Sequence, residues 1–292
     1  MSESDFRQRF VFDELDVRGC IVRLDKTSQT IQDTHHYPPH LAQALNEFAL
    51  AATLLRDSIK VSGSVTIQLR TPGAISLMMA DCMADRRVRA IAEYTSENLA
   101  PDAAIRLDEM GAGSTLAITI TPEEGERYQS IVPIEHATLS LCLEDYFARS
   151  EQLPSLFQFF TDGRVALGIA LHALPQEKVR DAAVTADHFS RLKMLLSSLT
   201  QEEALTLPSE EILRRLFHEE ACRLFDAHSV EFGCVCSAQK SLDAVASLGE
   251  EDVRALIQEQ QDAGHQALVV DCHFCFQRYE LDFNDITNLF SS

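Results

Sequence analysis

Four cysteines near the end of the chain are the residues whose types and spacing could do chemistry. Cys234 and Cys236 form a Cys-x-Cys pair, and after 35 intervening residues Cys272 and Cys275 form a Cys-x-x-Cys pair. Four thiolates suit a tetrahedral zinc ion with Zn–S bonds of ~2.3 Å. We therefore expect one Zn²⁺ per reduced chain at these four residues, which leaves the nearby histidines without a ligand role.

Other readings of the cysteines remain open. A purely structural four-cysteine zinc site is the commoner fate of such a cluster. A zinc-ribbon regulatory protein and a thiol-disulfide oxidoreductase are the alternative functions. The second is disfavoured because Cys272 is not expected to begin a helix after a parallel strand, the setting that lowers a thiol pKa.

The remaining cysteines are isolated from one another in the sequence. Cys20, Cys82 and Cys142 stand among apolar residues, so we expect them to be small buried side chains. Cys222 lies in the segment that follows the core, and the sequence does not indicate its role.

The charge of the chain limits its partners. Its 292 residues carry 45 acidic and 25 basic side chains, a net charge of −20, and residues 201–292 hold 18 acidic against 6 basic side chains, a net of −12. Nucleic acid and anionic membranes repel such a chain, so neither is an expected partner. We expect a cytoplasmic protein, because the charged start has no signal-peptide pattern and no run of about 18 apolar residues occurs.

Familiar enzyme motifs are missing from the sequence. It contains no Walker A motif and no Gly-x-Ser-x-Gly elbow, and Gly111-Ala-Gly113 lacks the third glycine of a dinucleotide fingerprint. We expect no enzyme activity.

The hydrophobic pattern predicts the elements that must position the cysteines. Residues 1–175 are expected to form an α+β core domain, with helices at 39–55 and 138–150 and strands at 61–69, 116–121, 128–134 and 165–171. Strands outnumber helices and do not alternate with them, which argues against a doubly wound sheet.

Two smaller parts are expected to follow the core. Residues 176–230 read as a helical linker, whose apolar stripes include Leu192, Leu195, Leu213 and Phe217 and must dock elsewhere. Residues 231–292 form the expected zinc-binding redox-switch domain. It is too small for a robust core, and thiolate-bound zinc can contribute about 10–16 kcal/mol to such a domain. We expect its unfolding to remove the docking partner of the linker and expose these stripes.

Several stretches of the chain resemble the redox-regulated 33-kDa heat-shock chaperonin family of bacteria. They are the two cysteine pairs and residues 120–129, 142–154, 205–208, 216–220 and 230–237. The chain departs from the family pattern at Phe276, where glycine usually follows the last cysteine, in its longer spacer between the pairs, and at Ala238-Gln239-Lys240, where an arginine is common.

The resemblance implies an ATP-independent holdase that binds unfolding client proteins under oxidative stress. It implies that Cys234, Cys236, Cys272 and Cys275 bind zinc when reduced. It also implies that oxidation pairs Cys234 with Cys236 and Cys272 with Cys275 and releases the metal. Whether the oxidised form is a homodimer is left open.

Overall fold

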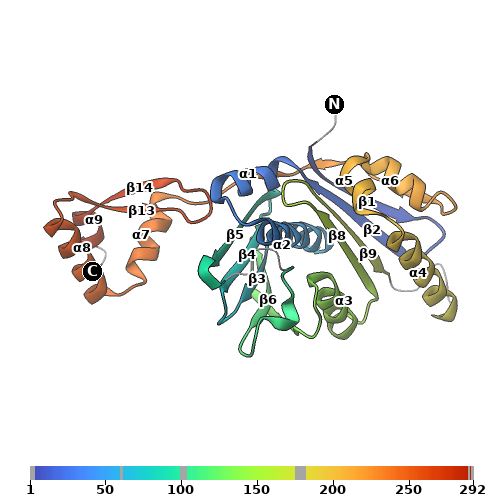
Figure 1. Ribbon diagram of the computed structural model, residues 1–292, viewed down its shortest axis with the longest axis horizontal. Coiled ribbons are helices and arrows are strands. Elements are labelled where there is room, and N and C mark those ends of the chain that lie inside the picture. The colour runs from blue at the N-terminus through green and yellow to red at the C-terminus, as the bar shows by residue number, and fades with distance from the viewer. Residues whose placement is uncertain (1–3, 60–61, 99–103, 175–181, 289, 291–292) are drawn as a thin grey trace. The chain divides into compact units, whose positions relative to one another are not determined.

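A computed structural model describes residues 4–59, 62–98, 104–174, 182–288 and 290. The chain divides into two compact units, Met1–Gly233 and Cys234–Ser292. Both combine helices and strands, so the predicted α+β fold is confirmed (Figure 1). Among the described residues, no helix has the length and apolar character needed to cross a membrane.

One antiparallel sheet of the first unit, called sheet A here, has the strand order β10-β1-β2-β9-β8, with β11 also pairing with β1. Its strands are β1 (Asp5–Phe12), β2 (Val17–Leu24), β8 (Ser155–Thr161), β9 (Ala166–Ala173), β10 (Cys222–Leu224) and β11 (His228–Ser229). All eight residues of β9 are buried, because both faces of sheet A are covered.

The second sheet, sheet B, has the order β12-β5-β4-β3-β6-β7 and is antiparallel except for the pair β12 and β5. Its strands are β3 (Gly63–Arg70), β4 (Ile75–Cys82), β5 (Arg87–Tyr94), β6 (Thr115–Pro122), β7 (Tyr128–Val132) and β12 (Glu231–Phe232). β3 shows the predicted alternation, with Val65, Ile67 and Leu69 buried on one face.

Helix α2 (Pro39–Ser58) lies between the two sheets and contacts strands of both (Figure 1). Most of its residues are buried, which explains why it carries apolar and small side chains around its whole circumference. Gly168 of β9 permits the close approach, because a Cβ there would lie 3.1 Å from Leu54 Cδ1. Helices α1 (Lys26–His35) and α3 (Leu139–Ser150) complete the core.

The segment expected to be a helical linker contains the helices α4 (Ala182–Ser197), α5 (Gln201–Thr206) and α6 (Ser209–Leu216). It also contains strands β10 and β11, which the sequence analysis did not predict. They are too short to produce a periodic pattern, and they form because the edge of β1 supplies their hydrogen-bonding partners. Residues 175–181 lie outside the described residues.

The linker helices dock on sheet A, within the first unit. Leu192, Leu213 and Phe217 are each at most 1% exposed and belong to one apolar cluster with side chains of β1, β2 and β9. The expectation that the C-terminal domain is the dock is therefore wrong. The outer face of sheet A is itself apolar, and it provides a larger continuous surface than a small zinc-binding domain can.

The second unit consists of α7 (Ala238–Ala246), α8 (Glu250–Asp262), the hairpin of β13 (Ala267–Asp271) and β14 (Arg278–Asp282), and α9 (Phe283–Asn288). Its buried cluster is small and contains Val245, Val253, Ile257, Leu268, Leu281, Phe283 and Ile286. A core of this size gives little stability by itself.

Candidate metal centre

Cys234 and Cys236 lie in the extended segment that precedes α7. Ser237 is the N-cap of this helix, and its hydroxyl oxygen accepts a hydrogen bond from the Lys240 N–H at 3.2 Å. Cys236 thus stands directly before the N-terminus of α7. The Lys240 ammonium donates to the Val235 carbonyl at 2.8 Å and adds positive charge beside the pair.

Cys272 and Cys275 lie in the turn between β13 and β14. The Cys272 N–H donates to the Gln277 carbonyl at 2.9 Å, and the Phe276 N–H donates to the Cys272 carbonyl at 2.8 Å. The turn requires a left-handed backbone at Phe276, with φ of 53°. This is the position at which the resemblance led us to expect glycine, the residue that adopts a left-handed backbone without strain.

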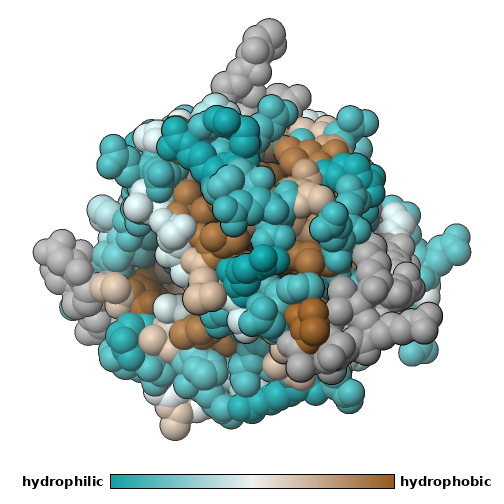
Figure 2. Space-filling model, turned by 90° about the vertical axis from the view of Figure 1, so that its right-hand side faces the viewer, coloured by the Kyte–Doolittle hydropathy of each residue, from teal (hydrophilic) through white to brown (hydrophobic). Residues whose placement is uncertain are grey.

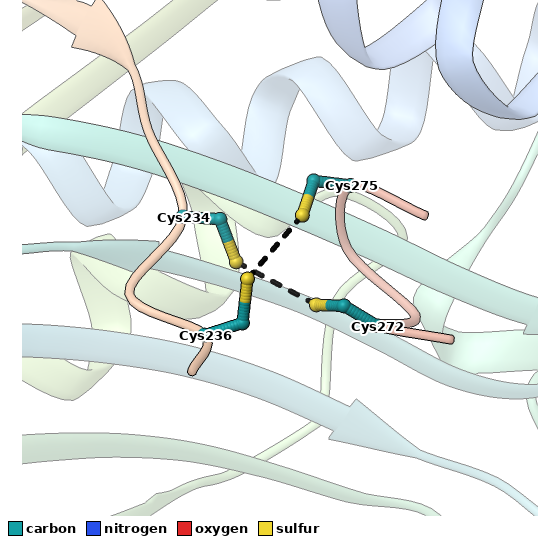
Figure 3. A group of neighbouring side chains, drawn as sticks. All are labelled: Cys234, Cys236, Cys272 and Cys275. Carbon is teal, nitrogen blue, oxygen red and sulfur yellow. Dashed lines mark hydrogen bonds between the residues drawn. The ribbon is translucent and has the colours of Figure 1, made fainter. Parts of the chain in front are cut away.

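The four sulfur atoms converge (Figure 3). They all lie within 4.8 Å of one another, with 3.6 Å between Sγ of Cys234 and Cys272 and 3.5 Å between Sγ of Cys236 and Cys275. A tetrahedral shell with ~2.3 Å bonds has edges of roughly 3.8 Å. The cluster therefore fits a metal site, and within the described part of the chain neither His265 nor His273 joins it.

The protonation of these thiols depends on a cation. Burial raises the pKa of Cys275 to about 12 and raises that of Cys272, and the neighbouring thiols act in the same direction. Without a positive charge at the centre, both groups would be protonated at neutral pH. Four thiolates at this spacing need a bound cation to offset their repulsion.

Tyr279 of β14 also contacts the cluster. Its hydroxyl donates a hydrogen bond to Sγ of Cys236 at 3.1 Å, and this bond is the main cause that raises the Tyr279 pKa to about 12. The sequence analysis missed Tyr279, and it named Lys240 only as a departure from the family pattern. Tyr279 is four residues after Cys275, on strand β14, which follows the turn. This short spacing could have indicated that its hydroxyl lies near the cysteine cluster.

The other cysteines lie outside the cluster. Cys20, Cys82 and Cys142 are buried, as predicted, and burial raises the pKa of each thiol, that of Cys82 to about 12. Cys222 is half-buried in β10, and burial raises its pKa to about 11. None of these thiols is a good nucleophile at neutral pH.

Comparison with known proteins identifies the family. A family model described as Hsp33 protein matches residues 5–282. The chain belongs to the Hsp33 family. Proteins named 33 kDa chaperonin from Azotobacter vinelandii (strain DJ) and Pseudomonas aeruginosa (strain UCBPP-PA14) are 43% and 40% identical to it over 291 residues, which cover all of this chain and 96% of each relative.

A solved structure shares the Hsp33 fold. The crystal structure of the 33 kDa chaperonin of Thermotoga maritima superposes with a TM-score of 0.75 and covers 98% of both chains at 19% identity. The suspected family resemblance is thus confirmed along nearly the whole chain.

Proposed function

We propose that this protein is a redox-regulated, ATP-independent chaperone that holds unfolding client proteins under oxidative stress. Membership of the Hsp33 family supports a chaperone, since its curated relatives are named chaperonins. The observation that carries the redox part is the convergence of four half-buried cysteine sulfurs in a compact unit with a small core. In this proposal residues 1–175 are the core domain, 176–230 the linker and 231–292 the redox switch, and the protein acts in the cytoplasm.

Zinc is the metal that these four residues would hold. All four ligand atoms are sulfur, and no carboxylate or imidazole belongs to the group found among the described residues. Thiolate sets select zinc over magnesium or calcium, and zinc itself is not oxidised or reduced. When bound, it would supply the stability that the second unit lacks, on the order of 10–16 kcal/mol.

Oxidation of the thiols is the proposed switch. The formation of each disulfide from two thiolates transfers two electrons to one molecule of hydrogen peroxide, which takes up two protons from the solvent and becomes two molecules of water. A sulfur oxidised to a sulfenic acid is no longer a thiolate ligand, so the second unit would lose its metal and unfold once the first sulfurs are oxidised, before both disulfides are complete.

The pairing proposed for the oxidised form joins Cys234 to Cys236 and Cys272 to Cys275. In the folded cluster the closest sulfur contacts instead run across the two pairs. Once the unit unfolds, however, closing a loop of a few residues costs less entropy than closing one of nearly forty. Unfolding therefore favours the pairs that are adjacent in sequence.

The linker would transmit the change to the client-binding surface. Directly before Cys234, β12 pairs with β5 over only Glu231 and Phe232, and the Gly233 N–H donates to the Val88 carbonyl at 3.1 Å. This short attachment can open when the following unit unfolds. The linker would then detach from sheet A and expose the apolar cluster that includes Leu192, Leu213 and Phe217.

While the linker is docked on sheet A, the solvent-exposed surface of the linker helices is less apolar than the cluster buried beneath them. On the side of α4, α5 and α6, apolar side chains are visible between polar ones (Figure 2). Met194 of α4 is 67% exposed there, whereas Leu195 is only partly buried at the edge of the docked face. Opening would thus join scattered apolar spots into one client-binding surface.

Zinc content and thiol titration test the metal site. The reduced chain should contain one zinc, Cys236→Ser should lose most of it, and Cys142→Ser should keep it. Client aggregation is then measured without ATP, and the peroxide-treated protein should suppress it while the reduced protein should not. Equal suppression by both forms would refute the switch, and catalytic reduction of insulin would favour an oxidoreductase instead.

Trypsin separates the possible disulfides. Cleavage at Arg223, Lys240, Arg254 and Arg278 places the first pair in peptide 224–240 and the second in peptide 255–278. Intact linear peptides, each two hydrogens lighter, would support the proposed pairing. A cross-linked species of 224–240 with 255–278 would contradict it. Size measurements on the oxidised protein before digestion determine whether the oxidised form is a homodimer.

A further inference from the structure

A concave site rich in arginine lies in the first unit, among β1, the end of α2 and the turn between β4 and β5. The cavity has a volume of about 290 Å³. Arg7, Arg9, Arg56 and Arg86 line it, and Asp57 is the single acidic residue among the described residues that do so. Four guanidinium groups against one carboxylate give the lining a net charge of +3, in a chain whose total charge is −20.

Asp57 explains part of this cluster. Its carboxylate pairs with Arg7 and, at 2.7 Å, with Nε of Arg9. Arg9 also donates to the Asp57 main-chain carbonyl at 2.9 Å, one of the carbonyls left open at the C-terminal end of α2. Arg7 and Arg9 therefore have a structural role in ending this helix. Arg56 and Arg86 are left without one.

Arg56 and Arg86 have no side-chain hydrogen-bonding partner within the described part of the chain. The Nε atom of Arg56 is fully buried and unsatisfied. A buried donor without an acceptor costs about 1–3 kcal/mol, and more when it is charged. A ligand that supplies the acceptor at this cavity would remove that cost.

Arg86 occupies a backbone position that disfavours it. It lies in the tight turn between β4 and β5 with φ of 67°, and its N–H donates to the Met83 carbonyl at 3.0 Å. Glycine or asparagine usually fills this left-handed position, and another residue costs roughly 1–2 kcal/mol there. Despite this cost, the turn has arginine at this position, and its guanidinium group lines the cavity.

A neighbouring histidine reports the positive field. His228 of β11 lies opposite Arg7 in sheet A. Burial lowers its pKa first, and the charges of Arg7 and Arg86 lower it further, while Asp226 opposes them. The arginines thus repel another positive charge at this place. An anion in the cavity would have the opposite effect on the imidazole.

We propose that this cavity binds a small phosphate-bearing anion. The planar fork of each guanidinium group matches two phosphate oxygens. Arg56, with its buried and unsatisfied Nε, and the half-buried Arg86 are the two arginines of the lining that no carboxylate pairs with among the described residues. The volume suits an anion larger than a single phosphate, such as a diphosphate or a phosphorylated metabolite. The net negative charge of the chain opposes entry only weakly, because the Debye length is about 8 Å at 0.15 M salt.

The binding constant of pyrophosphate for the reduced, zinc-loaded full chain is the first measurement, by calorimetry at about 0.15 M salt. Arg86→Gly should weaken binding at least tenfold, the loss expected for one charged hydrogen-bonding group. Glycine suits the left-handed turn, so this variant keeps its fold. Arg56→Gln should have a similar effect. Arg164→Gln, an exposed arginine outside the cavity, should bind as the parent does.

Two further arms identify the ligand chemistry. A sugar phosphate that competes with pyrophosphate would indicate a phosphorylated metabolite, and one that fails would indicate an inorganic oligophosphate. Citrate should bind at least tenfold more weakly than pyrophosphate. In nuclear magnetic resonance titrations, pyrophosphate should raise the His228 pKa. No binding, equal binding by Arg86→Gly, equal binding of citrate, or an unchanged His228 pKa would overturn the proposal.

Discussion

The hydroxyl of Tyr279 donates a hydrogen bond to Sγ of Cys236, at 3.1 Å, across the gap between β14 and the segment before α7. This hydrogen bond connects the hairpin of β13 and β14, which carries Cys272 and Cys275, to the segment that carries Cys234 and Cys236. A donor of this kind withdraws charge from a thiolate and fixes its direction, as groups behind metal ligands commonly do.

Tyr279→Phe should weaken zinc binding by about 10–100-fold, because the thiolate of Cys236 loses its donor while the ring keeps its packing. Competition with a chromophoric zinc chelator measures the affinity. Tyr128→Phe is the matched control, since Tyr128 is 59% exposed on β7 of the other unit. An unchanged affinity in Tyr279→Phe would show that the contact has no role at the metal site.

Phe276→Gly should stabilise the turn that carries Cys272 and Cys275. Phe276 has a φ of 53°, and relief of this left-handed conformation is worth roughly 1–2 kcal/mol. Amide hydrogen exchange of residues 267–282 in the zinc-loaded protein measures the effect, which should appear as slower exchange. Gln277→Gly, whose backbone is not left-handed, should instead speed exchange. Faster exchange in Phe276→Gly would contradict the prediction.

The imidazole of His172 should make the first unit sensitive to acid. It lies between two hydroxyls, with Nδ1 2.8 Å from Ser155 Oγ and Nε2 3.1 Å from Ser58 Oγ. Burial lowers its pKa to about 4, Arg18 acts in the same direction, and Asp57 opposes them.

The unfolded imidazole titrates near 6.5, so between about pH 6.5 and 4 the unfolded chain binds the proton more readily. The stability contribution is complete above this range and falls as the pH is lowered through it, by up to about 3 kcal/mol. Urea unfolding at several pH values tests this. His172→Gln should flatten the dependence, whereas His218→Gln, at an exposed site, should leave it unchanged.

Phe217→Ala should loosen the linker without oxidation. The ring of Phe217 is 1% exposed and packs edge-on against Phe12 with 5.1 Å between the ring centres. Its removal should cost about 3–5 kcal/mol of linker docking. The reduced variant should therefore suppress client aggregation in part. Met194→Ala, at an exposed position, should not. If exchange shows the linker open and the reduced variant stays inactive, the linker surface does not bind clients.

The sequence predicted those elements whose pattern is long enough to read. The helix at 39–55 and the strand at 61–69 appear as α2 and β3, because each repeats its apolar spacing over several turns or pairs. The four-cysteine cluster was predictable for a similar reason, since two short spacings define two chelating pairs.

Features that depend on long-range contact were not predictable. β10 is three residues long and exists only because β1 lies beside it. Phe217 docks on the outer face of sheet A and not on the small C-terminal unit. No local sequence pattern tells which of these two surfaces offers the larger apolar area. Arg7, Arg56 and Arg86 are far apart in sequence and share no spacing, so only the fold brings their guanidinium groups to one cavity.

Strands β10 and β11 cover the outer edge of β1, where Cys222–Leu224 lie opposite Phe10–Phe12 and His228–Ser229 opposite Phe6–Arg7. Detachment of the linker would leave main-chain N–H and C=O groups along this eight-residue strand without partners. An open strand edge accepts any extended polypeptide, since main-chain hydrogen bonds do not depend on side-chain identity. One surface could then hold clients of unrelated sequence by adding each of them to sheet A as a further strand.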